Sequence, residues 1–141
     1  MQPETLFSLC STLVLPGWLL LIFAPGWKWT QRITALISPL LLGLVYLALV
    51  TTNLGNSGGG FSTLALVAQL FENPWLLLAG WVHYLAFDLL IGAWQVRDAR
   101  RLQIPHLAVF PCLLLTFMLG PVGWLAYSLL RAVMRREFEV S

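Results

Sequence analysis

The chain has 141 residues, of which 59% are hydrophobic and only 10% are charged, and its mean hydropathy is +0.82. Soluble domains are about half apolar and about a quarter charged, so this composition excludes an ordinary water-soluble fold and predicts an integral membrane protein. The net charge of +2 comes from a few basic residues between apolar segments, which is typical of topology signals and not of a nucleic-acid surface. We expect a single domain over residues 1–141 and no nucleic-acid partner.

Four stretches are long and apolar enough to cross a membrane, because a helix needs ~20 residues to span ~30 Å of hydrocarbon. They cover about residues 6–23, 33–52, 74–96 and 105–130. Residues 61–71 are also apolar, but as a helix they would be only about 17 Å long. We interpret them as a short re-entrant or interfacial helix. The predicted fold class is therefore all-α, with about four transmembrane helices and one short additional helix.

Three local signals mark the helix ends and breaks. Asn73 can cap the third helix and Pro74 suits its first position. Gly120-Pro121 is expected to break or bend the fourth stretch, because proline removes a backbone donor. Trp18 is among the tryptophans that fall near predicted ends or kinks, as interfacial aromatics often do.

The basic residues predict an orientation, because loops that carry Lys and Arg tend to face the cytoplasm. The loops after the first and third predicted helices hold five of them, namely Lys28, Arg32, Arg97, Arg100 and Arg101. With four crossings, the tail would lie on the other side together with the N-terminus, although it carries Arg131, Arg135 and Arg136. Five basic residues in the two loops against three in the tail favour an N-terminus outside the cytoplasm. A hidden fifth crossing would move one end of the chain to the other side of the membrane.

Two ionisable side chains fall inside the third predicted helix, where charge near the bilayer centre costs ~2.5 kcal/mol or more. Asp88 lies about 21 Å along the helix from Pro74, and His83 lies near mid-depth. Five residues correspond to about 140° around a helix, so Asp88 and His83 do not share a face. Asp88 is either a functional group or a carboxylate that hydrogen-bonds to a neighbouring helix. His83 is either a functional group or a neutral imidazole that is satisfied by one backbone carbonyl.

Aromatic and polar residues surround these two positions at helical spacing. Trp81, Asp88 and Gln95 repeat every seven residues, Tyr84 is one turn before Asp88, and His83, Phe87 and Trp94 form the adjacent stripe. Such stripes predict an apolar pocket with a few polar groups, the usual form of a small-molecule site. Asp98 and His106 flank the basic loop at the interface, where they are solvated, cap a helix or bind a ligand.

The sequence contains no motif for metal, nucleotide or serine-hydrolase chemistry. Cys10 and Cys112 lie in apolar runs without close spacing, and we interpret both as packing residues. We therefore expect no bound metal and no cofactor.

The stretch from Trp81 to Leu89, which reads WVHYLAFDL, carries a W-x-H-x4-D core. Asp98, Pro105-His106, Cys112 and Gly120-Pro121-Val122-Gly123 follow it. This pattern, concentrated in residues 71–130, resembles the neoxanthin synthase family, the ABA4-like membrane proteins of plants, algae and bacteria. The resemblance implies a role in xanthophyll metabolism, where plant members are required to turn a 5,6-epoxide end group into an allenic alcohol.

That conversion is a net isomerisation, which needs a proton delivered to the epoxide oxygen and a vinylic proton removed, without a redox cofactor. The resemblance implies Asp88 as the acid, because burial favours a protonated carboxyl, and His83 as the base. It also implies that Asp98 and His106 bind the ring hydroxyl. The remaining substrate-binding candidates, which would stack along the polyene, are Trp81, Tyr84 and Trp94.

Whether the protein is an enzyme stays open, because two other functions fit the sequence. The first possibility is a membrane-embedded isomerase. The second is a non-catalytic protein that binds carotenoid or assembles a membrane complex. The third is a small proton-coupled carrier that uses Asp88 and His83. The absence of an evident inverted repeat weighs against the carrier. The expected partners are a carotenoid or another lipophilic small molecule and membrane lipids, with a second copy or a membrane complex left open.

The N-terminus is neither Arg/Ser-rich nor amphipathic, and it lacks the basic region and cleavage site of a signal peptide. We therefore expect no plastid transit segment and a bacterial origin. The expected location is the bacterial inner (plasma) membrane, or the thylakoid membrane of a photosynthetic bacterium.

Overall fold

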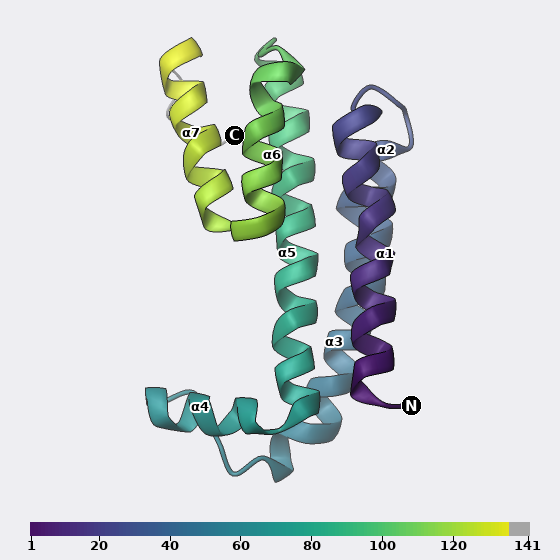
Figure 1. Cartoon of the computed structure of the whole chain (residues 1–141), viewed down its shortest axis with the longest axis vertical. Helices are drawn as coiled ribbons and strands as arrows, with labels where there is room; N and C mark the ends of the chain where they lie inside the picture. Colours follow the sequence, from purple (N-terminus) through teal and green to yellow (C-terminus); the bar gives the residue numbers. More distant parts are fainter. Residues whose placement is uncertain (136–141) are drawn as a thin grey trace.

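The structure is a computed structural model that describes residues 1–135, and every regular element in that range is a helix. Three long helical runs stand side by side (Figure 1). They are α1 (Pro3–Phe23), the continuous run of α2 (Thr30–Arg32), η1 (Ile33–Ile37) and α3 (Ser38–Asn53), and α5 (Pro74–Arg101). Each is long and apolar enough to cross a membrane, which is compatible with an integral membrane protein.

Helix α5 is the centre of the bundle. It packs against α1, α3 and α6, and more weakly against the remaining helices α4 and α7. Of its most apolar stretch 56% is buried, against 28% for α1 and 22% for the run that ends in α3. Asn73 caps it as predicted, because its Oδ1 accepts a hydrogen bond from the backbone N–H of Trp75 (2.9 Å), and Pro74 is its first residue.

The short predicted helix is present as α4 (Leu64–Glu72), which follows the 3₁₀ turn η2 (Leu54–Asn56). The Thr63 hydroxyl caps α4 by accepting from the backbone N–H of Leu66 (3.2 Å). Helix α4 lies across one end of the bundle, roughly perpendicular to the long helices (Figure 1). That position suits an interfacial helix, and its depth in a membrane stays a prediction.

The predicted fourth crossing over residues 105–130 is not a single helix, so the count of four crossings is not confirmed. Two antiparallel helices, α6 (His106–Leu119) and α7 (Pro121–Arg135), form a hairpin beside one half of α5 (Figure 1). Gly120 joins them with φ 45° and ψ −94°, a conformation that side chains with a Cβ rarely adopt. Pro121 then starts α7 at the position where its missing N–H costs nothing. Each arm is about 21–22 Å long, which is less than the ~30 Å of the hydrocarbon core.

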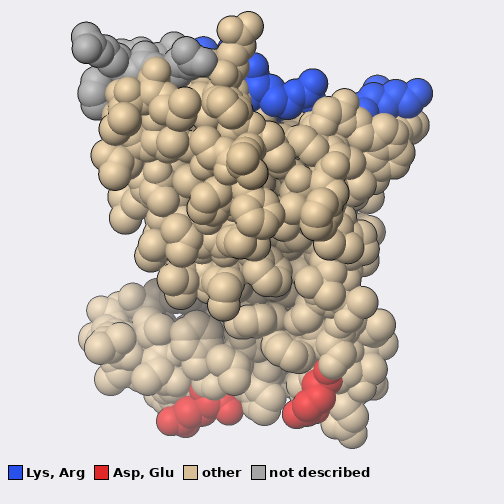
Figure 2. All heavy atoms as spheres, turned by 45° about the horizontal axis from the view of Figure 1, so that its top comes forward, with Lys and Arg blue, Asp and Glu red and all other residues tan. Residues whose placement is uncertain are grey.

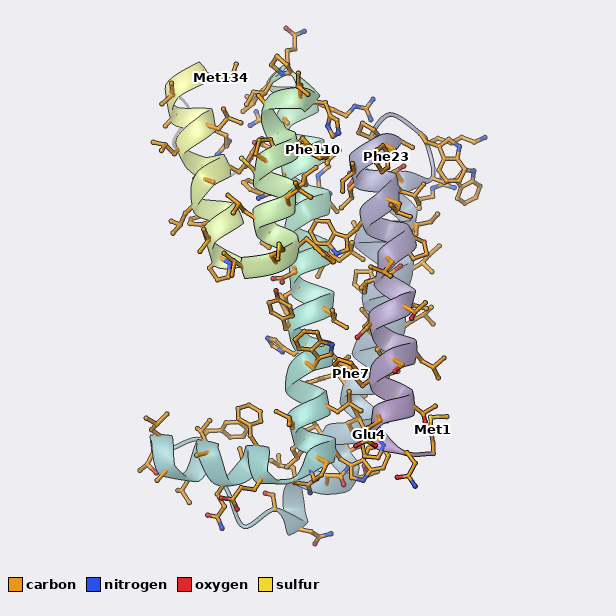
Figure 3. The ribbon with its side chains drawn as sticks, viewed as in Figure 1. Met1, Glu4, Phe7, Phe23, Phe110 and Met134 are labelled. Carbon is orange, nitrogen blue, oxygen red and sulfur yellow. The ribbon has the colours of Figure 1, made fainter. Side chains whose placement is uncertain are left out.

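The hairpin returns the chain to the end from which α6 started. Phe23, Phe110 and Met134 lie at one end of the molecule, whereas Met1 and Glu4 lie at the other (Figure 3). Lys and Arg side chains gather at the first of these ends and acidic side chains at the opposite one (Figure 2). The end of α7 therefore lies on the same side as the basic loops, which removes the conflict that four crossings created for Arg131 and Arg135. Arg136 lies outside the described residues.

The close approach of α6 and α7 depends on a residue without a side chain. A Cβ added to Gly123 would overlap the backbone nitrogen and the hydroxyl of Thr116 on α6, whereas a Cβ added to Gly43 on α3 would meet nothing within 4 Å. We expect Gly123→Ala to destabilise the protein by about 1–3 kcal/mol, because the two arms must move apart. Gly43→Ala should be neutral or slightly stabilising, because alanine favours a helix.

Thermal unfolding of both variants in the same detergent measures this difference. Equal melting temperatures for Gly123→Ala and Gly43→Ala would contradict the tight hairpin.

Candidate functional site

Asp88 lies where α5 passes the turn between α6 and α7. The residue is only 9% exposed, and its Oδ1 would lie 2.7 Å from a Cβ on Gly120. Because Gly120 joins the C-terminus of α6 to the N-terminus of α7, the carboxyl lies beside both helix ends. Its Oδ2 is buried and has no hydrogen-bond partner among the described residues. Such atoms are uncommon in folded proteins, so Oδ2 is a candidate to bind a ligand.

An aromatic row leads from α1 to Asp88. The ring of Trp81 lies between those of Phe7 and Tyr84, with centroid distances of 5.4 Å and 5.3 Å. The Trp81 indole N–H donates to the hydroxyl of Ser11 (3.0 Å). The Tyr84 hydroxyl lies beside the Asp88 carboxyl and donates to the backbone carbonyl of Met118 at the end of α6 (3.0 Å). The row therefore connects the first turns of α1 to the tip of the hairpin.

An apolar cavity of about 600 Å³ lies along this row. Its walls come from the first turns of α1, the end of α4 and the first three turns of α5, and they include Phe7, Phe71, Leu77, Trp81 and Tyr84. Small-molecule sites usually have about 300–1,000 Å³ and mostly apolar walls. The cavity therefore has the size and the chemistry of a site for a lipophilic molecule.

His83 projects to a different side of α5, as the 140° separation predicted. Its ring stacks on Phe87 at 4.7 Å and lies 5.6 Å from the ring of Tyr46 on α3. Together with residues of α3 and α4 it lines a second cavity of about 280 Å³. The structure brings Asp88 together with Tyr84 rather than with His83, and the acid and base roles of Asp88 and His83 stay predictions.

Asp98 is the counter-ion of a buried arginine on α7. The Nε of Arg131 lies 2.7 Å from Asp98 Oδ2, and both side chains are only 2% exposed. The Tyr127 hydroxyl donates to the same oxygen (2.7 Å), and Arg101 Nη2 lies 3.0 Å from Oδ1. This ion pair fastens α7 to α5 at the basic end of the hairpin.

The other two predicted binding residues also belong to the basic end. The Trp94 ring meets that of Tyr127 edge-on at 5.3 Å, and the guanidinium of Arg131 lies 5.7 Å from its centroid. His106 Nε2 hydrogen-bonds the backbone carbonyl of Ile22 on α1 (2.8 Å). Ten residues of helix, about 15 Å, separate Asp98 from Asp88. Trp94, Asp98 and His106 thus form a group apart from Trp81 and Tyr84, and their role in substrate binding stays a prediction.

Sequence reasoning missed the polar contacts that hold the hairpin. The Gln95 amide donates to the hydroxyl of Thr116 (2.9 Å) and to the carbonyl of Gly123 (3.1 Å), and all three residues are buried. The spacing of Gly123, Tyr127 and Arg131, one every four residues, puts them on the buried face of α7. That spacing was the available signal, because it aligns a small, an aromatic and a charged residue on one helical face.

Within residues 1–135, no three His, Cys, Asp or Glu side chains lie close enough together to hold a metal ion. Cys10 and Cys112 are free thiols, and both are buried in the core. Their predicted packing role is confirmed.

Comparison with known proteins agrees with the resemblance seen in the sequence. A family model described as "ABA4-like: ABA DEFICIENT 4-like" matches residues 5–127. No curated protein and no solved structure matches the chain.

The Asp98–Arg131 pair makes a stability experiment possible. We expect Asp98→Ala to cost about 3–5 kcal/mol, because it leaves the Arg131 charge buried without its carboxylate. The double variant Asp98→Ala/Arg131→Met should cost less than the sum of the two single variants, because both members of the ion pair are then removed together. Detergent melting temperatures measure both, with Arg97→Met on the exposed face of α5 as the control. Additive losses would show that the pair does not stabilise the hairpin.

Proposed function

Because this chain belongs to the ABA4-like family, we propose that it is a membrane protein that binds a xanthophyll-type carotenoid and isomerises its epoxide end group. Family membership supports the class of ligand. The observation that carries the assignment to this site is Asp88, whose buried Oδ2 has no hydrogen-bond partner among the described residues and whose neighbour Tyr84 lines the apolar cavity. A buried carboxyl inside a membrane costs free energy, and such residues are usually functional. Proton transfer is a function that this carboxyl can perform.

The chemistry needs one proton to arrive and one to leave. The C–O bond to the ring carbon that carries the polyene breaks, and the oxygen stays on the neighbouring ring carbon and takes the proton of Asp88. Loss of the vinylic proton from the adjoining polyene carbon then gives the allene. Because His83 projects to another side of α5, we assign this second transfer to the Asp88 carboxylate too, which restores its starting form. Electrons balance without a redox cofactor.

The position of Asp88 also defines the pose of the substrate. A carotenoid is about as long as the hydrocarbon core is thick, so its end rings ordinarily lie at the headgroups. Asp88 is about 21 Å along α5 from Pro74, so a reacting ring must enter the interior of the bilayer. The cavity that leads along Trp81 to Tyr84 supplies an apolar route of that kind.

A bacterial plasma membrane or a thylakoid membrane is the location we propose.

Substitution of Asp88 tests whether its carboxyl supplies the proton. In a bacterial host that makes an epoxy-carotenoid, we expect Asp88→Asn to lower formation of the allenic product about 100-fold or more, because the amide cannot supply the proton. Chromatography of the extracted pigments measures the product. Glu72→Gln, at an exposed carboxylate on α4, is the matched control and should convert like the wild type.

Two results would change the proposal. Unchanged conversion by Asp88→Asn would remove Asp88 from the reaction, and a comparable loss in His83→Ala would assign the second transfer to His83. Wild-type protein that carries pigment without converting it would favour the non-catalytic binding protein.

A further inference from the structure

We propose that the two cavities are halves of one groove around the first turns of α5, which takes a single elongated polyene from the leaflet at the acidic end, with Phe71 as a movable wall between the halves. The inference rests on the proposed function for the class of ligand. It adds the path by which the ligand enters and the residues that hold it.

The groove lies in one half of the molecule. On α5 the larger cavity extends from Pro74 to Tyr84, which is about 15 Å or half of the ~30 Å hydrocarbon core. On α1 it includes Glu4 and Phe7, which lie in the half of the molecule opposite to Met134 (Figure 3). The α6–α7 hairpin covers only the other half of α5 (Figure 1). A ligand can therefore approach this half of α5 sideways from one leaflet, and it meets the hairpin tip at Tyr84.

One contact divides the groove. Phe71 and Gly80 line both cavities. A Cβ on Gly80 would lie 3.0 Å from Cε1 of Phe71, so the phenyl ring packs directly against the backbone of α5. The Phe71 side chain is 45% exposed and lines both cavities, so rotation of its ring away from Gly80 would join them.

The walls suit a flat conjugated chain with polar ends. Phe7, Trp81 and Tyr84 present a continuous run of rings on one side of Gly80, whereas Tyr46 and His83 supply rings with polar atoms on the other. Apolar burial drives the binding and the few polar groups orient the ligand. A polyene that carries a hydroxylated ring matches both features.

The test uses two leucines of nearly equal exposure. Leu77 lines the larger cavity and is 56% exposed, whereas Leu47 on α3 is 57% exposed and lines neither half of the groove. The full chain is purified in mild detergent from a host that makes a hydroxylated carotenoid, and the bound pigment per protein is read from absorbance. We expect Leu77→Trp to lower the bound pigment about tenfold, and Leu47→Trp to leave it unchanged.

Two further measurements test the division and the path. Phe71→Ala joins the cavities, so it should keep or raise the bound pigment. A retinoid alcohol that carries a photoreactive diazirine should label peptides that contain Phe7 and residues 71–84, and not those that contain Phe23 or Phe110.

Equal pigment in Leu77→Trp and Leu47→Trp, or labelling at the Phe23 end, would overturn the groove even if the wild type converts epoxide. Pigment that depends on Leu77 without any conversion would support the groove and overturn the proposed isomerase. A wild type that carries no pigment would overturn the groove.

Discussion

A buried arginine needs a counter-charge, and this requirement explains how the C-terminal third of the molecule is built. Arg131 is 2% exposed, and its partner Asp98 lies on α5 near the basic end. If α7 continued across the membrane away from α6, Arg131 would leave its carboxylate, at a cost of several kcal/mol. The chain therefore turns back at Gly120, and α7 returns along α5 to the end at which α6 began.

The return of α7 also determines where the candidate site lies. Because the hairpin arms are shorter than the hydrocarbon core, its tip ends beside Asp88 in the interior of α5 and leaves the first turns of α5 uncovered. Helix α4 lies across the end of that uncovered half. The result is an apolar cavity with aromatic walls that ends at Tyr84, the neighbour of Asp88. The same hairpin thus positions Asp88 and leaves the first turns of α5 open to the side.

The sequence predicted the features that depend on local chemistry and missed those that depend on which helices meet. The lengths of the apolar stretches predicted the three long helices, and Asn73-Pro74 predicted the start of α5. Gly120-Pro121 predicted the break between α6 and α7. The direction of the chain after that break could not be predicted, because Arg131 was counted as a topology signal and not as the partner of Asp98. Similarly, Trp18 was placed at an interface, whereas it is buried against α5, where the absence of a side chain at Gly92 admits its ring.

The half-depth hairpin is the central claim, and the depth of spin labels along α7 tests it most directly. In a background without Cys10 and Cys112, single labels at the exposed positions Val122, Val133 and Trp27 would be compared in sealed vesicles with uniformly oriented protein, for access to oxygen and to a water-soluble nickel chelate added on one side only. We expect Val122 to report the bilayer interior, and Val133 to report the surface shared with Trp27. A label at Val133 that reports the surface shared with Met1 would contradict the hairpin and restore a fourth crossing.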